Sequence, residues 1–158
     1  MQKFRNATVI DAARCFEIEA SAYEGDEAAT LAKISKRIEI YPEGFLILQI
    51  KGQVVGFMNC ACAYDVEMSD EDFKELIGHD PDAPNVVIMS VVVDPAYQGR
   101  GLSTVLMTEF VKRMTAMKKS KIYLMCKEHH VPLYEKFGYQ YLRPSASIRV
   151  RPWRDDLA

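Results

Sequence analysis

The sequence predicts an α/β fold, and three observations support this prediction. Segments with strand character alternate with segments of helical periodicity along most of the chain. Residues 86–93 form a nearly continuous apolar run, which is typical of a central strand covered on both faces. A Gly-rich turn leads from that run into a helical pattern, as expected where parallel strands are joined through a helix. The expected element order is βααββ(α)βαβαβ, with helices flanking a mixed central sheet.

The N-terminal part is predicted to begin with a strand followed by a helix. Residues 3–10 are expected to form the strand. Asp11 is the expected N-cap of the helix, which should end near Tyr23. The predicted apolar face of this helix carries Ala12, Cys15, Phe16 and Ala20.

A second helix and a hairpin are predicted next. The helix should start at the acidic pair Asp26-Glu27 and end before Tyr41, because acids are favourable at a helix N-terminus. Its expected apolar residues are Leu31, Ile34 and Ile38. Residues 44–50 and 53–64 have strand character and are separated by two residues only, a connection that joins antiparallel strands.

The second half is expected to contain two short helices, one longer helix and three strands. A pattern similar to a capping box at Ser69 and Asp72 predicts a short helix that ends near Leu76. After a loop come, in order, a strand at 86–93, a helix at 102–118, a strand at 121–126, a short helix at 131–138 and a final strand at 139–150.

Length and charge limit the functional class. Residues 1–158 have the length of one domain, so a single domain with one site is expected. The net charge of −2 lacks the basic excess that binding to a phosphate backbone requires, so nucleic acid is not an expected partner. No apolar run is long enough to span a bilayer, and the N-terminus lacks the apolar segment of a signal peptide. These features predict a cytoplasmic protein with no membrane partner.

The four cysteines and three histidines do not predict a metal site. Cys15, Cys60, Cys62 and Cys126 lack the paired spacing of zinc ligands and lie mostly in apolar segments, so they are expected to be small core residues.

The turn after residues 86–93 is suited to an anion. Backbone N–H groups at the start of a helix have no intrahelical acceptor, and the helix dipole adds partial positive charge there. Gly99 and Gly101 carry no side chain that would keep a phosphate from the backbone, and Arg100 adds a formal charge. The alternative is a strand–helix turn in which the glycines serve backbone geometry only.

This turn resembles the acyl-CoA-binding motif of the GCN5-related N-acetyltransferase (GNAT) superfamily. That motif has Gln or Arg, two residues, Gly, one residue, and then Gly or Ala. Gln98, Gly101 and Ser103 fill these positions, with Ser103 as a small-residue variant. The order of the expected elements is also similar to that of the superfamily, and residues 15–28, 41–58 and 123–139 resemble its arylalkylamine N-acetyltransferase branch.

The resemblance implies acetyl-CoA as cosubstrate. It implies that the strand backbone pairs with the pantetheine arm and that the turn amides hold the pyrophosphate. The implied cofactor-binding residues are Val91, Val92, Val93, Gln98, Gly99, Arg100, Gly101, Leu102, Ser103 and Thr104. Tyr134 stands at the position of the superfamily's general-acid tyrosine. Periodicity alone favours another interpretation, in which Tyr134 packs one face of a short helix.

The general base is not indicated by the resemblance. Vertebrate arylalkylamine acetyltransferases use two histidines on the strand before the turn, and Val87 and Met89 occupy those positions here. Glu19, Glu24 and Ser90 are candidates because they are expected near the cleft, although ordinary solvated carboxylates would explain the two acids equally well.

The predicted function is acetyl transfer from acetyl-CoA to a primary amine, with a small aryl-, alkyl- or polyamine as the acceptor. Two alternatives stay open: acetylation of a protein N-terminus or lysine, and a non-catalytic acyl-CoA sensor. The C-terminal segment 149–158 is compatible with an edge strand or with a homodimer contact.

Overall fold

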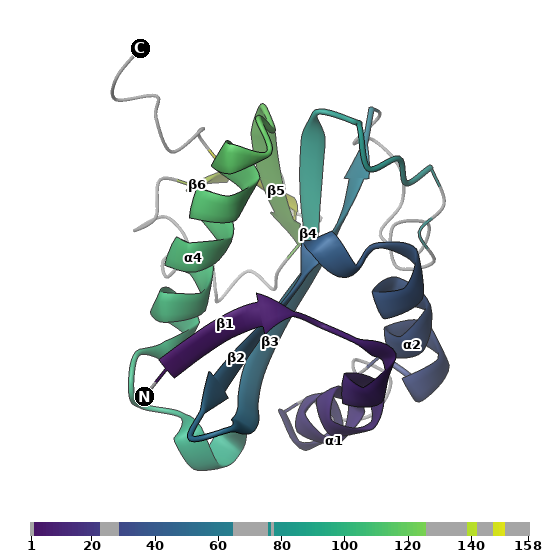
Figure 1. Cartoon of the computed structure of the whole chain (residues 1–158). Helices are drawn as coiled ribbons and strands as arrows, with labels where there is room; N and C mark the ends of the chain where they lie inside the picture. The colour runs from purple at the N-terminus through teal and green to yellow at the C-terminus, as the bar shows by residue number, and fades with distance from the viewer. Residues whose placement is uncertain are drawn as a thin grey trace. The chain divides into compact units, whose positions relative to one another are not determined.

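The computed structural model describes residues 2–22, 29–64, 76, 78–125, 139–141 and 147–150 (Figure 1). The strands are β1 (Gln2–Asn6), β2 (Phe45–Ile50), β3 (Gln53–Ala63), β4 (Asn85–Val93), β5 (Lys121–Met125), β6 (Tyr139–Tyr141) and β7 (Ser147–Val150), and the helices are α1 (Ala12–Ala22), α2 (Leu31–Ile40) and α4 (Leu102–Ala116). Among the described residues the strands pair in the order β1-β2-β3-β4-β5-β7-β6. The chain divides into two compact units, Met1–Asn59 with Ser90–Phe110 and Cys60–Met89 with Val111–Ala158.

The predicted hairpin is confirmed in the first unit. β2 and β3 pair antiparallel, and Ile50 lies opposite Gln53. Lys51 and Gly52 both have positive φ, 53° and 79°, as a two-residue type I′ turn requires. β1 pairs antiparallel with β2 on its other side.

The first strand is shorter than predicted because a capped turn interrupts it. β1 ends at Asn6, and a 3-10 turn spans Val9–Asp11 with Thr8 as its N-cap. Asp11 is therefore not the N-cap. Its carboxylate accepts the Thr8 N–H at 2.8 Å and forms a bidentate ion pair with Arg5. The Arg5 guanidinium is the main reason that the pKa of Asp11 lies below its usual value.

The buried face of α1 differs from the predicted one. Ala12, Cys15, Ile18 and Glu19 are buried, whereas Phe16 is 36% exposed and Ala20 is also exposed. Successive residues are about 100° apart around a helix, so a stripe that contains Cys15 and Ile18 leaves Phe16 on its margin. The sequence prediction was wrong for Phe16 and Ala20.

The second helix starts later than predicted. α2 begins at Leu31, because the Thr30 side chain caps it by accepting the Lys33 N–H at 3.2 Å. The expected start at Asp26-Glu27 was wrong, since residues 29 and 30 precede the helix in non-helical backbone. Leu31 is exposed, while Ile34 and Ile38 are buried as expected.

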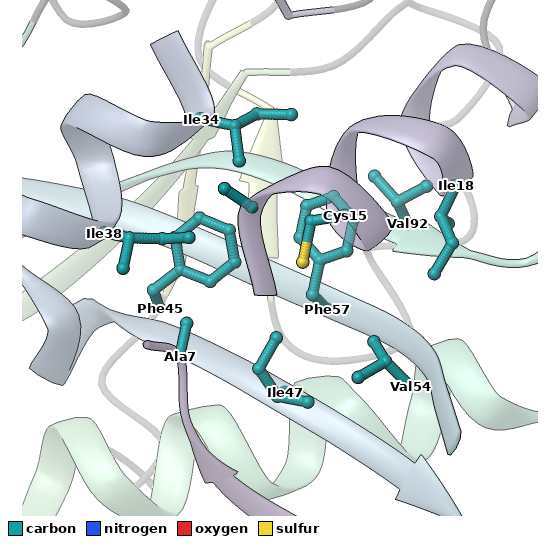
Figure 2. Packing of buried hydrophobic residues seen from close by; sticks show 11 residues of the cluster. Ala7, Cys15, Ile18, Ile34, Ile38, Phe45, Ile47, Val54, Phe57 and Val92 are labelled. Carbon is teal, nitrogen blue, oxygen red and sulfur yellow. The ribbon is translucent and has the colours of Figure 1, made fainter. Parts of the chain in front are cut away.

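The core of the first unit lies between the two N-terminal helices and one face of the strands. Figure 2 shows Cys15 and Ile18 of α1 and Ile34 and Ile38 of α2 together with strand residues. The strand side chains of this cluster are Phe45, Ile47, Val54, Phe57 and Val92. The rings of Phe45 and Phe57 stack with centroids 5.4 Å apart. We refer to this side of β3 and β4 as the helix α1/α2 face.

The helix α4 packs at the opposite face. A Cβ added to Gly56 would lie 3.2 Å from Leu106 Cδ1 and 3.0 Å from the Val92 carbonyl oxygen. Because successive side chains of a strand point to opposite faces, the direction of this Cβ is opposite to that of Phe57. The absence of a side chain at Gly56 lets β3, β4 and the start of α4 approach closely.

In the second unit, β4 and β5 form the predicted parallel pair, from Asn85↔Lys121 to Ile88↔Leu124. The predicted final strand at 139–150 was wrong: β6 and β7 are separate strands that pair antiparallel with each other, and β7 also pairs antiparallel with β5. Pro144 stands between them in the sequence and lacks the N–H that a central strand needs. The predicted helices at 69–76 and 131–138 lie outside the described residues, apart from Leu76.

The described cysteines are core residues, as predicted. Cys15, Cys60 and Cys62 are buried free thiols. Burial is the main cause that raises the pKa of Cys15 to about 12 and the pKa of Cys60 well above its usual value. Such thiols stay protonated and unreactive at neutral pH. Cys126 lies outside the described residues.

His79 ties the loop before β4 to the end of β3. Its Nδ1 accepts the Cys62 N–H at 3.0 Å, and the Asp80 N–H donates to the Cys62 carbonyl. The pKa of His79 lies below 6.5, chiefly because of burial, and Lys119 lowers it further while Asp80 acts in the other direction. An Nδ1 that accepts a hydrogen bond carries no proton, so folding selects the neutral imidazole.

We expect His79 to make the stability of the protein depend on pH below neutrality. In the unfolded chain a histidine takes up a proton near pH 6.5, whereas folded His79 does so only at lower pH. The unfolded state therefore binds more protons in this window, and the unfolding free energy should decrease as pH falls from about 7.5 to about 5.5. In His79→Asn, the Asn Oδ1 can accept the Cys62 N–H without titrating. Urea unfolding across this range should show a shallower slope for the variant, and parallel profiles would contradict the assignment.

Candidate active site

The carboxyl end of β4 is joined to α4 by a turn that starts at Asp94. The Asp94 N–H donates to the Val55 carbonyl of β3 at 2.8 Å, and the Asp94 carboxylate accepts the Ala96 N–H at 3.0 Å. The Ala96 N–H is the main cause that lowers the pKa of Asp94. A 3-10 helix, Pro95–Tyr97, follows. These bonds attach the start of the turn firmly to the sheet.

The two glycines of the turn have left-handed backbone conformations. Gly99 has φ 83° and Gly101 has φ 72°. A Cβ added at either position would meet no atom within 4 Å, so both glycines border open space. Glycine adopts this conformation without the strain that a side chain imposes. The backbone of the turn is thus accessible to a ligand.

The N–H groups of residues 99–104 form an anion-binding geometry. The Gln98 N–H donates to the Pro95 carbonyl, and the next bonded N–H is that of Val105, which donates to the Gly101 carbonyl at 3.2 Å. Between them, no acceptor for a backbone N–H is present within the part of the chain that the structure describes. The helix dipole of α4 adds positive potential at this end. A row of such donors at a helix N-terminus is the geometry that binds anions in proteins.

Arg100 contributes a cation beside these donors. Its guanidinium carbon lies 5.0 Å from the centroid of the Tyr97 ring. Such a cation–π contact orients the side chain without neutralising its charge. Arg100 therefore retains its full positive charge for an anionic ligand.

Arg14 of α1 links the turn to the neighbouring strand. Arg14 Nη2 donates to the Asp94 carboxylate at 2.6 Å, and Arg14 Nε donates to the Val54 carbonyl at 3.2 Å. Arg14 also pairs with the exposed Glu17 on its own helix. The guanidinium thus connects α1, β3 and the first residue of the turn. The sequence analysis missed Arg14 and Asp94, because residues 80 positions apart carry no local signal of their pairing.

We expect loss of the Arg14 hydrogen bonds to weaken the binding of coenzyme A at the turn. Arg14→Met keeps the length of the side chain but removes the bonds to Asp94 and Val54. Its unfolding free energy should fall by about 1 kcal/mol, since the pair is partly exposed. Calorimetry should show affinity for coenzyme A reduced about threefold to tenfold, because a less ordered turn must be ordered on binding. Glu17→Gln is the matched control and should change neither the unfolding free energy nor the affinity for coenzyme A. Equal losses in both variants would contradict the proposed support of the turn by the Arg14–Asp94 contact.

The main chain at the end of β4 offers hydrogen-bonding groups at one edge. The Val92 carbonyl faces β3, as its closeness to Gly56 shows. Because backbone groups alternate in direction along a strand, those of Val91 and Val93 point away from β3. The pairing of β4 with β5 ends at Ile88↔Leu124, so Val91 and Val93 lie beyond it. This edge is suited to an added strand-like ligand.

Comparisons with known proteins agree with this geometry. The sequence pattern of the acetyltransferase (GNAT) family matches residues 11–139. The chain belongs to this family. Serotonin N-acetyltransferase of Mesocricetus auratus is 28% identical over 148 residues, which are 91% of this chain and 70% of that protein. Glucosamine 6-phosphate N-acetyltransferase of Trypanosoma brucei brucei is 28% identical over 122 residues, 77% of this chain and 74% of that protein.

A solved structure shows the same fold. The loading GNATL domain of CurA from Lyngbya majuscula superposes with a TM-score of 0.76 at 16% identity, covering 85% of this chain and 69% of that chain. The match of the family pattern confirms the predicted superfamily, and the superposition confirms its α/β fold. The predicted enzyme class, an acetyl-CoA-dependent N-acetyltransferase, is also confirmed.

The predicted catalytic residues of this acetyltransferase are only partly described. Tyr134 and Glu24 lie outside the described residues. Val87 is buried and Met89 is half-buried, and neither can accept a proton. Glu19 and Ser90 are both buried. Among the described residues, no cluster of His, Cys, Asp and Glu is arranged to hold a metal ion, and no helix is long and apolar enough to cross a membrane.

Glu19 is the candidate base with the most distinctive environment. The side chain is 1% exposed, and one carboxylate oxygen accepts the Ala29 N–H. The other oxygen, Oε1, has no hydrogen-bond partner in the described part of the chain. A buried carboxylate with a free oxygen is costly to the fold, and such groups are concentrated at functional sites.

Proposed function

We propose that this acetyltransferase transfers the acetyl group of acetyl-CoA to a small primary amine, an aryl-, alkyl- or polyamine. The observation that carries the proposal is the set of backbone donors at residues 99–104, for which the described ranges of the chain provide no backbone acceptor. The names of the two curated relatives state small amines, serotonin and glucosamine 6-phosphate, as their substrates. This supports a small acceptor over a protein N-terminus or lysine.

In this proposal the residues named from the sequence bind the cosubstrate. Amides of residues 99–104 and the Arg100 charge hold the pyrophosphate, and the main chain of Val91 and Val93 pairs with the pantetheine arm. The side chain of Val92 instead belongs to the core, and its carbonyl faces β3. Gln98 supports the strand end, where its side-chain amide approaches the Val93 carbonyl at 3.5 Å. Bound acetyl-CoA supplies an activated thioester.

The proton transfers are assigned to two side chains. A primary alkylammonium ion has a pKa near about 10, so it must lose a proton before its nitrogen attacks. Glu19 is the proposed acceptor of that proton, directly or through water, because its Oε1 is free and buried. Tyr134 is the proposed general acid, which gives a proton to the leaving thiolate. A backbone N–H of the Val91–Val93 edge stabilises the developing oxyanion.

We propose that residues 1–158 form one acetyltransferase domain that acts in the cytoplasm. The two compact units share strands β3 and β4 and helix α4, which supports a single folding domain. The cytoplasmic location is an inference from the sequence alone.

Thiol release from acetyl-CoA tests the proposed function. The protein is mixed with aryl-, alkyl- and polyamines and, separately, with a lysine-containing peptide that has a free N-terminus. Release with small amines alone is the expected result. Release with the peptide alone would assign a protein substrate, and binding of acetyl-CoA without release on any acceptor would assign a sensor.

A further inference from the structure

Asn59 is a buried polar residue that neither the fold nor the phosphate site explains. It is 1% exposed on β3, in a strand whose neighbouring residues are mostly apolar. Among the residues that the structure describes, neither its Oδ1 nor its Nδ2 has a hydrogen-bond partner. Leaving a buried polar group unsatisfied costs about 1–3 kcal/mol, and a carboxamide has both donors and acceptors to satisfy. A buried amide without partners is therefore a candidate for ligand contact.

Asn59 lies on the helix α1/α2 face. It follows Phe57 by two residues on β3, and side chains two apart on a strand share a face. Ser90 precedes Val92 by two residues on β4, so it also lies on this face. Ser90 is 9% exposed. Two buried polar residues thus interrupt an apolar face.

The strand register brings these two residues opposite each other. At one end, the Asp94 N–H donates to the Val55 carbonyl. At the other end, Asn85 Nδ2 donates to the Tyr64 carbonyl. Counting four residues inward from the first contact gives Asn59 on β3 and Ser90 on β4, and counting five from the second gives the same pair. Directly opposed residues of antiparallel strands have Cβ atoms about 5.5 Å apart.

Within this polar pair, Ser90 is next to the proposed reaction centre, and Asn59 lies beside Ser90 on β3, on the side away from the pantetheine edge. Ser90 directly precedes Val91, whose main chain is proposed to face the thioester. Helix α4, which follows the turn, packs against the other face, where Gly56 is close to Leu106. An acceptor that lies over the helix α1/α2 face with its amine at the carbonyl carbon would extend across Ser90 toward Asn59. Glu19, also free at Oε1, belongs to the buried side of α1.

We propose that Asn59 selects acceptors that carry a hydroxyl group on the carbon next to the amine-bearing carbon. This inference rests on the proposed function and names its substrate class, a 1,2-amino alcohol. The Asn59 Oδ1 accepts an N–H of the amine, and the Nδ2 donates to the hydroxyl oxygen. A carboxamide presents one acceptor and one donor side by side, so it binds a neighbouring donor–acceptor pair in two-point contact. A plain alkylamine leaves the Asn59 amide N–H groups unpaired and binds less well.

Matched substrates test the proposal. Three pairs that differ by hydroxyl groups are ethanolamine and ethylamine, 2-amino-1-phenylethanol and 2-phenylethylamine, and 3-amino-1,2-propanediol and propylamine. For the pair with the highest turnover, the wild type should favour the hydroxylated member by about tenfold or more in kcat/KM, the size expected for one specific polar contact. In Asn59→Leu this ratio should fall to about twofold or less, while the KM for acetyl-CoA stays unchanged.

Two controls separate recognition from a structural role. Met58→Leu changes a buried neighbour on the opposite face and should keep the wild-type ratio. Asn59→Leu should unfold at the same or a higher temperature than the wild type, because it removes an unsatisfied buried amide. The proposal is overturned if the wild type shows no preference, or if Asn59→Leu retains it; a buried water bound to Asn59 would then account for the amide.

A binding measurement distinguishes this proposal from the proposed function. Calorimetry of the paired amines is carried out on the complex of the protein with coenzyme A. If no amine releases thiol, the proposed function fails, and calorimetry still decides the role of Asn59. Hydroxyl-dependent binding that is lost in Asn59→Leu supports the assignment, and absence of such binding in the wild type overturns it.

Discussion

Gly101→Val should lower the affinity for coenzyme A by about thirtyfold or more while leaving the affinity for pantetheine nearly unchanged. Gly101 has φ 72°, and its missing Cβ faces open space at the start of α4. A valine there would project into the volume assigned to the pyrophosphate and would disfavour the left-handed conformation that orients the amides. Pantetheine lacks the pyrophosphate, so it does not depend on these donors. Calorimetry with both ligands measures the two effects.

Gly52→Val is the matched control for backbone strain. Gly52 has φ 79° and also borders open space, but it belongs to the β2–β3 turn. Both variants should lose a similar amount of stability, on the order of 1–3 kcal/mol, from a residue forced into a disfavoured conformation. Only Gly101→Val should lose discrimination between coenzyme A and pantetheine. The same loss in Gly52→Val would show that strain, and not the phosphate contact, is responsible.

Tyr134→Phe should lower kcat by about tenfold or more with little change in the affinity for acetyl-CoA. The substitution removes only the hydroxyl group that is proposed to protonate the leaving thiolate. Phenylalanine keeps the ring, so packing should be preserved. Steady-state kinetics and calorimetry measure the two quantities. Tyr97 lies beside Arg100 in the turn between β4 and α4. Tyr97→Phe is the control for loss of a hydroxyl group and should retain kcat.

A leaving-group series sharpens this test. General-acid catalysis matters most for a basic leaving thiolate, so acetyl donors with more acidic thiols should be less sensitive to Tyr134→Phe. Equal turnover of wild type and variant with acetyl-CoA would remove Tyr134 from the mechanism. Tyr134 would then be a packing residue.

Local sequence signals predicted the parts of this protein that depend on near neighbours. The Lys51-Gly52 turn, the apolar β4 and the glycines before α4 each follow from the conformational preferences of a few adjacent residues. Local signals gave the wrong helix start where another nearby residue was the N-cap. Asp11 is not the N-cap, because Thr8 takes that position and the Asp11 carboxylate instead completes the capping box and pairs with Arg5. Helix α2 is capped by Thr30 and begins at Leu31 instead of at the upstream acids.

The sequence predicted the turn of the candidate site but not the residues that the fold brings near it. The motif at 98–103 indicated the turn that is proposed to bind the pyrophosphate, because backbone donors and glycines are adjacent in the chain. Asn59 carried a signal that could have been used: a carboxamide within a long apolar strand pattern is unusual and requires a partner or a function. The sequence offered no means of pairing it with Ser90, 31 positions away.

The amino-acid sequence by itself determined the α/β class, which follows from the period of apolar residues and from turn chemistry, and the superfamily, which follows from the motif at 98–103. It also predicted a diphosphate site at this turn, because glycines and backbone donors are contiguous there. Only the tertiary structure decided that Arg14 bonds to that turn, that Val91 and Val93 lie beyond the pairing of β4 with β5, and that Asn59 and Ser90 are opposed on one face. The physical reason is that strand register and helix packing join groups far apart in the chain, and no local preference encodes which of them meet.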